Sequence, residues 1–538
     1  MRLIILVFFV TLYASLAAQN YTNPIIPGFN PDPSICKAGN DYYLVTSSFE
    51  YFPGIPIYHS SDLVSWKMVD HVLSRESQIN MEGYPASEGV YAPTIRYHDG
   101  TFYVVVSVLR RNPRRVKNIL ITTDSLMSRW SDPVEITNSS LWGIDPSLFF
   151  NEDGRCYFTA NRKDQVAQPY SSYREIVLQE LDLRQMKLTG PIDIIGKAAV
   201  VGGATAEGSH IYKKDGHYYL LISEGGTRTN HAVTISRSEK IRGPYEQCTY
   251  NPILTHRHLQ ETISLRNIGH ADIVQTPDNE WWMVCLGVRF TNDWSLMGRE
   301  TFLVPMIWPD NSFPIINPGN GLVQMEYPLP GIAKETNNLA NTFFDDFSTS
   351  ILKPEWTFLR NNPTCYEFTD NRQLKIDLKK MTVADLSSPA FIGKRIENSD
   401  FETTIKLSFS ATSESEEAGL VLLSNNENYF RFTLSKSNIQ LKETINGRTI
   451  ILAKELLEYD KEVYLKVLSK NSLMDFYYSM DGRDWHLIKR RVNTSCLRNY
   501  KYTGNFIGLY GTSNGEETTN HFLVDWFRYH QKIHGKYN

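Results

Sequence analysis

The chain has 538 residues, a length that corresponds to two or more domains, or to one large repeat domain and a second domain. Its formal net charge of −4 is close to neutral and no run of Lys and Arg stands out, which excludes the electrostatic footprint of a nucleic-acid-binding protein. Aromatic residues make up 12% of the chain, and such side chains are typical of sheet-rich cores.

The first predicted element is the stretch 1–18, MRLIILVFFVTLYASLAA, in which Arg2 precedes an apolar run that ends in small residues. This order is typical of a cleavable secretory signal peptide, and the run is too short for a membrane span. A buried N-terminal strand or helix is the alternative interpretation. No later stretch approaches the roughly 20 apolar residues of a spanning helix. We therefore expect a periplasmic or secreted protein without a membrane span.

One layout recurs five times between residues 24 and 322, with segments that start at Asp32, Ala92, Asp145, Glu207 and His270. The intervals between these starts are 60, 53, 62 and 63 residues. Each segment continues with an apolar strand, a turn rich in Gly, Asp or Asn, and a second strand that opens on aromatic residues. A repeat of about 50–65 residues with four short strands has the size of one propeller blade. Residues 23–325 therefore predict a five-bladed β-propeller, and a sandwich with accidental similarity is the alternative.

The second part of the chain carries a different pattern. Residues 326–342 hold two prolines followed by small and polar residues, and predict a linker. From residue 343 to residue 532, strand-like runs recur about every ten residues, as in an antiparallel, jelly-roll-like β-sandwich. The fold class is therefore all-β, with a propeller followed by a sandwich. The sandwich is either a binding module or a packing partner of the propeller, and we favour the packing role.

The six cysteines have long and irregular spacings, and no C-x-x-C pair is present. Export permits disulfides, but a chain of this size does not depend on them, and most of the six lie in apolar, strand-like segments. We interpret them as buried thiols rather than metal ligands. They are Cys36, Cys156, Cys248, Cys285, Cys365 and Cys496.

The starting residues of the five blades should point toward the central axis at one end of the propeller and form a ring. Three of them are carboxylates, Asp32, Asp145 and Glu207, and a fourth is His270. A propeller does not require this set, and crowded like charges shift pKa values. The ring therefore indicates a functional site.

Paired carboxyl groups are the machinery of glycosidic bond hydrolysis, which needs a protonated acid at the leaving oxygen and a carboxylate that activates water or attacks directly. Asp32 and Glu207 fall on the first and fourth blades, which are not adjacent, and such a gap suits an inverting enzyme, whose carboxyls lie about 6.5–9.5 Å apart. We therefore predict that Asp32 is the base and Glu207 the acid. Asp145, on the third blade, is the neighbouring anion that raises the pKa of Glu207.

Other residues are candidates for binding the sugar. Arg299 follows the strands of the fifth blade and can reach the ring to bind hydroxyl groups. His270 can hold the catalytic water, orient a carboxylate or ligate a central ion, so a structural calcium near His270 is a hypothesis, although no cofactor is required. Phe49, Phe52 and Tyr91 are candidate platforms for the apolar faces of a sugar. Each of these side chains also has a purely structural interpretation.

These motifs resemble glycoside hydrolase family 43, in its branch of β-xylosidases and α-L-arabinofuranosidases. The likeness covers about residues 23–325 and is carried by NPIIPGFNPDPSI at Asp32, WGIDPSLFF at Asp145, AEGSHIYKKDGHYYL at Glu207, IGHADIV at His270 and MGRETFLVPMIW at Arg299. The tail, from FFDDFSTSILKPEWTFLR to FLVDWFRYH, resembles the accessory sandwich of this branch. The resemblance implies an inverting mechanism and a pocket for one terminal sugar that a sandwich loop narrows. We expect that loop at residues 502–515.

The predicted function is that of an exo-acting inverting hydrolase that releases terminal β-D-xylose, α-L-arabinofuranose or both from plant hemicellulose oligosaccharides or polysaccharides. An invertase-like fructosidase is disfavoured, because its motifs N-D-P-N-G, R-D-P and E-C-P correspond here to PDPS, IDPS and AEGS. A non-catalytic sugar-binding propeller is disfavoured because all three carboxylates are present. The sequence leaves the choice between the two pentoses open.

Overall fold

The structure is a computed structural model that describes residues 19–126, 128–137, 142–163, 172–199, 205–259, 262–291, 293–334, 342–459, 462–498 and 501–531. Apart from two 3-10 turns, η1 (Arg257–Leu259) and η2 (Ser495–Leu497), the regular structure in these ranges consists of β-strands. No helix within them is long and apolar enough to span a membrane. The all-β prediction is confirmed. The predicted signal peptide lies outside the described residues.

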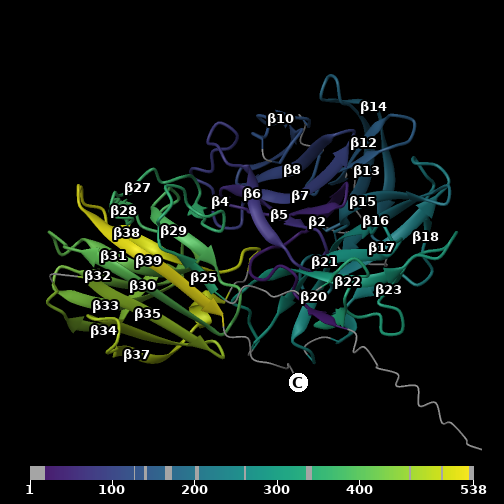
Figure 1. Cartoon of the computed structure of the whole chain (residues 1–538). Helices are drawn as coiled ribbons and strands as arrows, with labels where there is room; N and C mark the ends of the chain where they lie inside the picture. Colours follow the sequence, from purple (N-terminus) through teal and green to yellow (C-terminus); the bar gives the residue numbers. More distant parts are fainter. Residues whose placement is uncertain are drawn as a thin grey trace, which may run out of the picture.

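The purple-to-teal part of the chain forms five antiparallel sheets, each of which is one blade (Figure 1). The first comprises β2 (Ser34–Ala38), β3 (Asp41–Val45), β5 (Gly54–Ser60) and β6 (Lys67–Leu73). The second comprises β7 (Gly89–His98), β8 (Thr101–Arg111), β9 (Arg114–Thr123) and β10 (Val134–Glu135). The third comprises β11 (Ser147–Phe150), β12 (Cys156–Arg162), β13 (Glu175–Asp182) and β14 (Lys187–Lys197).

The fourth blade comprises β15 (Glu207–Lys214), β16 (His217–Glu224), β17 (Ala232–Ser238), β18 (Glu246–Gln247) and β19 (Leu254–Thr255). The fifth comprises β20 (Leu265–Gln275), β21 (Trp281–Arg289), β22 (Arg299–Ile307) and β23 (Ile315–Ile316). The first strands of the blades contact one another in a closed cycle, β2 with β7, β7 with β11, β11 with β15, β15 with β20 and β20 with β2. This closed cycle is a five-bladed propeller, and it brings the blade starts around one axis.

The two ends of the propeller are held together by a short sheet of β1 (Asn20–Thr22) and β24 (Glu326–Pro328). Its central pair, Tyr21 and Tyr327, is buried, with ring centroids 5.8 Å apart. The segment predicted as a linker therefore begins as a strand, because its aromatic residue pairs with the start of the chain. Residues 335–341 lie outside the described residues.

The green-to-yellow part forms a sandwich of two antiparallel sheets (Figure 1). One holds β25 (Thr342–Asp345), β27 (Tyr366–Phe368), β28 (Leu374–Asp377), β30 (Phe401–Phe409), β35 (Glu462–Lys470), β36 (Leu473–Ser479), β37 (His486–Asn493) and β39 (His521–Gln531). The other holds β29 (Ala390–Arg395), β31 (Glu417–Asn425), β32 (Asn428–Ser435), β33 (Asn438–Ile445), β34 (Arg448–Leu456) and β38 (Phe506–Thr512). In β35 every second side chain is buried, as the alternating pattern of its sequence predicts.

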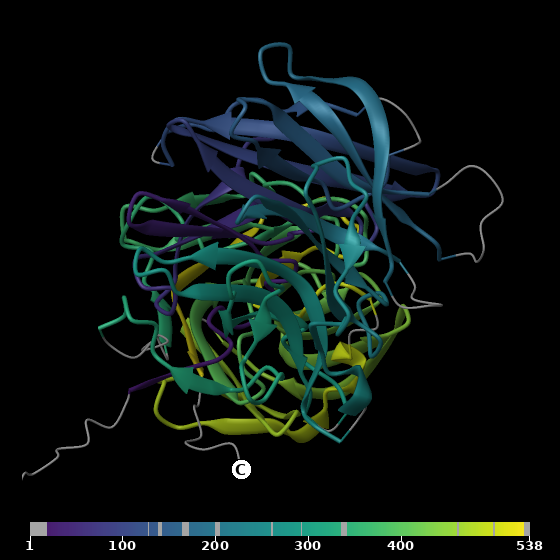
Figure 2. The ribbon, with the colours of Figure 1, turned by 90° about the vertical axis from the view of Figure 1, so that its right-hand side faces the viewer.

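The sandwich packs against the propeller, and Figure 2, which looks from the propeller side, shows it behind the blades. A two-stranded sheet of β4 (Tyr51–Phe52) and β26 (Phe358–Leu359) joins the two parts. One hydrophobic cluster contains Leu296 of the propeller together with Trp356 of the sandwich. Buried Arg395 donates from Nε to the carbonyl oxygen of Phe29 at 2.9 Å. Because a core crosses the boundary, each part buries apolar surface that the other would expose.

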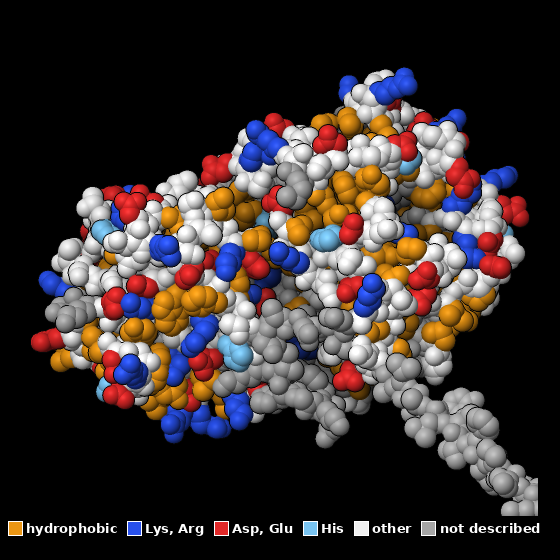
Figure 3. Space-filling model, viewed as in Figure 1, with side chains coloured by type: hydrophobic (Ala, Val, Ile, Leu, Met, Phe, Trp, Pro, Cys, Tyr) orange, Lys and Arg blue, Asp and Glu red, His pale blue; other side chains and the backbone are white. Residues whose placement is uncertain are grey.

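The surface and the cysteines agree with the composition. Lys and Arg alternate with Asp and Glu over most of the face in Figure 3, as the near-neutral net charge leads one to expect. All six cysteines are buried free thiols. Burial raises the pKa of Cys36 and of Cys156 to about 12, so neither thiol ionises readily.

Candidate active site

The residues at the starts of the five blades share one backbone conformation, the left-handed one. Left-handed φ angles occur at Asp32 (56°), Ala92 (39°), Asp145 (59°), Gly208 (55°) and His270 (47°). Such angles are uncommon outside glycine, and aspartate tolerates them better than most residues. The strand ladders of the second, fourth and fifth blades shift register at this point. A register shift of this kind re-aims side chains, so each blade start turns one residue toward the axis.

The fourth blade departs from the repeat deduced from sequence. The residue that shares the left-handed conformation is Gly208, and Glu207 precedes it. A Cβ atom on Gly208 would lie 3.1 Å from the His270 ring, so glycine lets the two blades approach closely. Glu207 reaches the axis as the first residue of β15, paired with Ser223 of the next strand. The fourth member of the predicted ring is therefore offset by one residue.

A cavity of about 140 Å³ lies on the axis at this end of the propeller. It is lined by Asp32, Phe49, Tyr91, Arg111, Ile144, Asp145, Thr205, Glu207, Gly226, Thr227, His270, Arg299 and Tyr502. The structure thus brings together seven of the eight residues predicted for catalysis and sugar binding. Ala92 is absent from this lining, and Tyr91 takes its place. Phe52, a further candidate platform, instead pairs with Phe358 at the domain boundary.

Asp32 is buried and held by three groups. Ser47 Oγ donates to its Oδ2 at 2.7 Å, Arg299 Nη1 donates to its Oδ1 at 2.6 Å, and His270 Nδ1 lies 3.6 Å from Oδ1. Burial by itself raises the pKa of this carboxyl, but Arg299, His270 and the Ser47 hydrogen bond together bring the pKa below its ordinary value of 3.8. Asp32 is therefore ionised across the neutral range.

The pKa values of Asp145 and Glu207 are raised, in contrast to the lowered pKa of Asp32. Burial, with the charge of Asp32 as the next cause, raises the pKa of Glu207 from 4.5 to about 7. Burial also raises the pKa of Asp145 well above 3.8, and the charges of Glu207 and Asp32 add to that shift. The two groups therefore hold a proton near neutral pH. The backbone N–H of Gly208 donates to Asp145 and favours its charged form, but burial and the two neighbouring carboxyl groups outweigh this bond and keep the pKa of Asp145 raised.

Arg299 connects the propeller site to the sandwich. It is the first residue of β22, and its Nε and Nη2 donate to the carbonyl oxygen of Tyr502 at 3.3 and 3.2 Å. Its guanidinium also lies over the ring of Phe49, with Cζ 5.5 Å from the centroid. The same side chain thus pairs with Asp32 and fixes the position of the sandwich segment.

Three aromatic rings form one wall of the cavity. Phe49 lies 4.5 Å from Tyr91 and 6.2 Å from Tyr502 between centroids, and the Phe49 and Tyr502 rings are almost parallel at 8°. Arg111 lies over the Tyr502 ring at 5.2 Å and donates to the Tyr91 hydroxyl at 3.2 Å. Of the loop expected at 502–515, Tyr502 is the residue in the cavity lining, because Phe506–Thr512 form β38 inside the sandwich.

The surroundings of His270 bear on the calcium hypothesis. Calcium binds six to eight oxygen atoms. The carboxylate beside His270 is that of Asp32, which is already paired with Arg299. Among the described residues no group of three or more His, Cys, Asp or Glu side chains is arranged to hold a metal ion. Calcium also accepts backbone carbonyl oxygens and waters, so a calcium ion near His270 stays a prediction.

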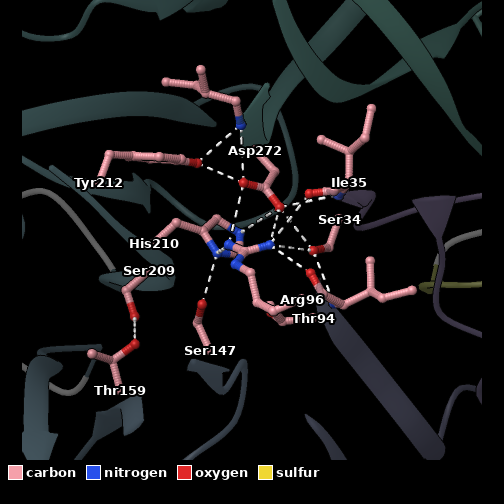
Figure 4. A network of polar contacts seen from close by, with 12 residues as sticks. Ser34, Ile35, Thr94, Arg96, Ser147, Thr159, Ser209, His210, Tyr212 and Asp272 are labelled. Carbon is pink, nitrogen blue, oxygen red and sulfur yellow. Dashed lines mark hydrogen bonds and ion pairs between the residues drawn. The ribbon is translucent and has the colours of Figure 1, made fainter. Parts of the chain in front are cut away.

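A polar network joins the first strands of the blades, two to five residues further along the chain than the residues that start each blade (Figure 4). Its centre is the guanidinium of Arg96, which donates to Asp272 Oδ2 and to His210 Nδ1, each at 2.8 Å. Ser34 and Tyr212 donate to the same carboxylate at 2.8 and 2.6 Å. Burial opposes ionisation of Asp272, yet Arg96 and these donors hold its pKa well below the ordinary range. The network gives the cavity a rigid, charge-balanced floor.

Five lining residues were not predicted from the sequence: Arg111, Ile144, Thr205, Gly226 and Thr227. Ile144 directly precedes Asp145 within WGIDPSLFF, and the other four lie outside the repeated motifs, in strand ends and connections. A signal was available only for Tyr502, through the expected sandwich loop. The seven predicted residues, in contrast, all belong to the repeat or to the motifs beside it.

Fold and site together define a propeller protein whose axial cavity is lined by three buried carboxyl groups. Residues 21–314 match the sequence profile of Glycosyl hydrolases family 43, and residues 344–530 match the Beta xylosidase C-terminal Concanavalin A-like domain. The chain belongs to glycosyl hydrolase family 43. It is a glycoside hydrolase that acts on carbohydrate, and enzymes of this family need no cofactor for catalysis.

Characterised relatives match along almost their whole length. A xylosidase/arabinosidase from Butyrivibrio fibrisolvens is 36% identical over 94% of this chain and 98% of its own length. The non-reducing end alpha-L-arabinofuranosidase BoGH43B from Bacteroides ovatus is 35% identical, with 95% of each chain covered. The crystal structure of a xylan beta-1,4-xylosidase from Bacillus halodurans superimposes with a TM-score of 0.88 at 31% identity, over 95% of this chain and 100% of that one. The Bacillus halodurans structure therefore matches this chain over both the propeller and the sandwich.

Proposed function

We propose that this chain is an exo-acting inverting glycoside hydrolase that releases a terminal pentose, β-D-xylose, α-L-arabinofuranose or both, from plant hemicellulose oligosaccharides. The observation that carries the proposal is the electrostatic contrast within one cavity: Asp32 has a lowered pKa, and Glu207 has a pKa raised to about 7. A base must be ionised and an acid protonated at the same pH, and this contrast meets both conditions.

The mechanism follows from these protonation states. Asp32 takes a proton from a water molecule as the water oxygen attacks the anomeric carbon. Glu207 gives its proton to the glycosidic oxygen on the opposite face, and the bond between that oxygen and the anomeric carbon breaks. The attack and departure occur on opposite faces, so one displacement inverts the anomeric centre. Asp32 ends protonated and Glu207 ionised, and exchange with solvent restores both.

The other cavity residues support this chemistry. With the shared proton on Glu207, the negative charge of neighbouring Asp145 disfavours ionisation of the acid. Arg299 and His270 orient the Asp32 carboxylate and offer donors to sugar hydroxyls. Phe49 and Tyr91 supply an apolar wall against which one face of the ring can pack.

The exo mode is supported by the size of the cavity. Pockets for drug-sized ligands measure roughly 300–1,000 Å³, whereas this one measures about 140 Å³ and is walled on one side by Tyr502. Such a space suits a single pentose rather than the interior of a chain. The relatives named xylosidase and arabinofuranosidase support a pentose as that sugar. The signal-like residues 1–18 support an exported enzyme, periplasmic or secreted.

Proton NMR of the earliest product tests the reaction. With p-nitrophenyl β-D-xylopyranoside and α-L-arabinofuranoside as substrates, the first free sugar should be the anomer opposite to the substrate. A retained anomer, or transfer of the sugar to added methanol, would contradict a single displacement.

Two substitutions separate the base from the acid. Asp32→Ala should slow every substrate by about 10²–10⁴-fold, because no leaving group replaces an activated water. Glu207→Ala should spare dinitrophenyl glycosides, whose leaving group departs without a proton, and slow natural oligosaccharides. The ratio of the two rates is the measurement. If the leaving-group dependence followed Asp32 instead, the two roles would have to be exchanged.

A further inference from the structure

The three aromatic rings of the cavity wall, Phe49, Tyr91 and Tyr502, come from three separate segments of the chain, and Tyr502 belongs to the second domain. Each of these segments is bonded to Ser87, a residue of the connection between β6 and β7. Ser87 is 2% exposed and is not part of the cavity lining. It can therefore affect a bound sugar only through the rings.

Ser87 uses each of its three polar groups for one part of this wall. Its backbone carbonyl oxygen accepts a hydrogen bond from the Tyr91 hydroxyl. Its Oγ accepts a hydrogen bond from the backbone N–H of Tyr502 at 3.2 Å. Its backbone N–H donates at 2.9 Å to Oε2 of Glu50, the residue that directly follows the third ring. One buried residue thus connects all three parts of the wall.

Glu50 joins Ser87 to the boundary between the two domains. The Glu50 side chain is fully buried, and its backbone carbonyl oxygen accepts a hydrogen bond from the backbone N–H of Arg360 in the sandwich at 2.9 Å. Burial raises the pKa of this carboxyl from 4.5 to about 7, so the uncharged form is abundant near neutral pH. The bond to Ser87 matters because a buried N–H without an acceptor is costly.

The backbone of Ser87 is left-handed, with a φ of 63°. This conformation is uncommon outside glycine and persists where the surrounding structure holds it in place. In Ser87 the hydrogen bonds to Glu50, Tyr91 and Tyr502 supply that restraint. The conformation and its three bonds therefore depend on one another.

We propose that Ser87, anchored by Glu50, is a positioning residue that holds the three rings at the spacing that fits one terminal pentose. The inference rests on the proposed function and deepens it. Rings on separate segments of two domains keep fixed separations, 4.5 and 6.2 Å between centroids here, when a common residue restrains them. The proton transfers are assigned to Asp32 and Glu207, and neither is bonded to Ser87 in the described part of the chain. A change at Ser87 should therefore weaken sugar binding and spare the chemical step.

Ser87→Gly removes the Oγ and keeps the backbone bonds, and glycine adopts the left-handed conformation without strain. With p-nitrophenyl β-D-xylopyranoside and α-L-arabinofuranoside, KM should rise about three- to tenfold, the effect of one lost hydrogen bond, while kcat stays within about twofold. An unchanged KM, or a loss confined to kcat, would overturn the assignment.

Ser472→Gly is the matched control for this substitution. Ser472 is a second buried serine with a left-handed backbone, φ 59°, in the turn between β35 and β36. Its Oγ has no hydrogen-bond partner among the residues that the structure describes. The control variant should keep the wild-type KM and kcat. A rise of KM equal to that of Ser87→Gly would mean that the effect is not specific to the cavity wall.

Two variants of Glu50 test the anchor. Glu50→Gln keeps an oxygen that can accept the Ser87 N–H and should have a wild-type KM. Glu50→Met has a similar size but no such acceptor, and should raise KM to the same extent as Ser87→Gly. Equal KM values in the two Glu50 variants would show that this residue only fills space, and its role as anchor would be wrong.

Hydrogen–deuterium exchange at the Tyr502 amide measures the positioning without any reaction. Because this N–H donates to Ser87 Oγ, it should exchange faster in Ser87→Gly than in the wild type, and at the wild-type rate in Ser472→Gly. Unchanged exchange in Ser87→Gly would overturn the inference. If the wild type hydrolysed neither aryl glycoside while exchange at Tyr502 became faster in Ser87→Gly, the proposed function would fail and the positioning of Tyr502 by Ser87 would stand.

Discussion

Replacing Glu207 by glutamine keeps the size of the side chain and removes its ability to ionise. In the unfolded chain this carboxyl loses its proton near pH 4.5, whereas in the folded protein it keeps the proton up to about pH 7. Between these values the folded state binds more protons than the unfolded state, so the free energy of unfolding falls as the pH rises. A difference of about 2.5 pKa units, at 1.36 kcal/mol per unit, amounts to roughly 3 kcal/mol.

The Glu207→Gln protein should therefore be more stable than the wild type by about 3 kcal/mol at pH 8.5, and by much less at pH 4.5. Removal of the charge also relieves Asp145, whose own pKa it raises. Urea unfolding at both pH values, followed by tryptophan fluorescence, measures the two differences. Glu414→Gln, at an exposed position, is the matched control and should change neither.

Two results would refute this reasoning. An equal stability difference at both pH values would mean that the protonation of Glu207 is not linked to folding. A less stable variant at pH 8.5 would mean that the folded protein favours ionised Glu207, and the assignment of this residue as the acid would fall with it.

Three further substitutions and one truncation test other parts of the structure. Asp145→Asn removes the anion beside Glu207, so the alkaline limb of the pH profile of kcat/KM, near pH 7, should move to lower pH; an unmoved limb contradicts the role of Asp145. Tyr502→Ala opens the cavity wall and should raise KM about tenfold with a smaller change in kcat, and equal KM values would show that the sandwich does not contribute to binding. Truncation after Lys334, which keeps the closing strand Glu326–Pro328, exposes the shared core and should yield insoluble or inactive protein, whereas a soluble propeller with wild-type kinetics would make the sandwich an independent module. Arg96→Met leaves Asp272 buried without its cation and should lower the free energy of unfolding by about 3–5 kcal/mol in urea titrations; an unchanged value would show that the axial network is not structural.

The repeat in the sequence was sufficient to predict the propeller and most of its site. The turn and strand signals recur in each blade because each blade must bury the same two faces. Asp32, Asp145 and His270 could be identified because they occupy equivalent positions in this repeat. The sequence pattern did not predict that, in the fourth blade, the residue with the left-handed conformation is Gly208 and not Glu207. Apolar and turn periodicity do not report φ, and the glycine that takes the left-handed conformation, Gly208, follows the carboxylate instead of replacing it.

Contacts between distant segments were beyond the reach of sequence patterns. Phe52 carries the same aromatic signal as Phe49, yet it pairs with Phe358 while Phe49 faces the cavity. Both lie in one short connection, and only the docking of the sandwich separates their environments. The strand at Glu326–Pro328 likewise depends on a partner near the start of the chain, about 300 residues away.

The sequence by itself determined the all-β class, the five blades and the carboxyl set of the site, because these depend on periodicity and residue type within each repeat. The tertiary structure decided the protonation states, since the lowered pKa of Asp32 and the raised pKa of Glu207 arise from burial and from charges on other blades. It also decided the wall that Tyr502 of the sandwich provides to the cavity. Electrostatic fields and cavity walls are sums over groups that meet only after the chain has folded, and no local pattern contains them.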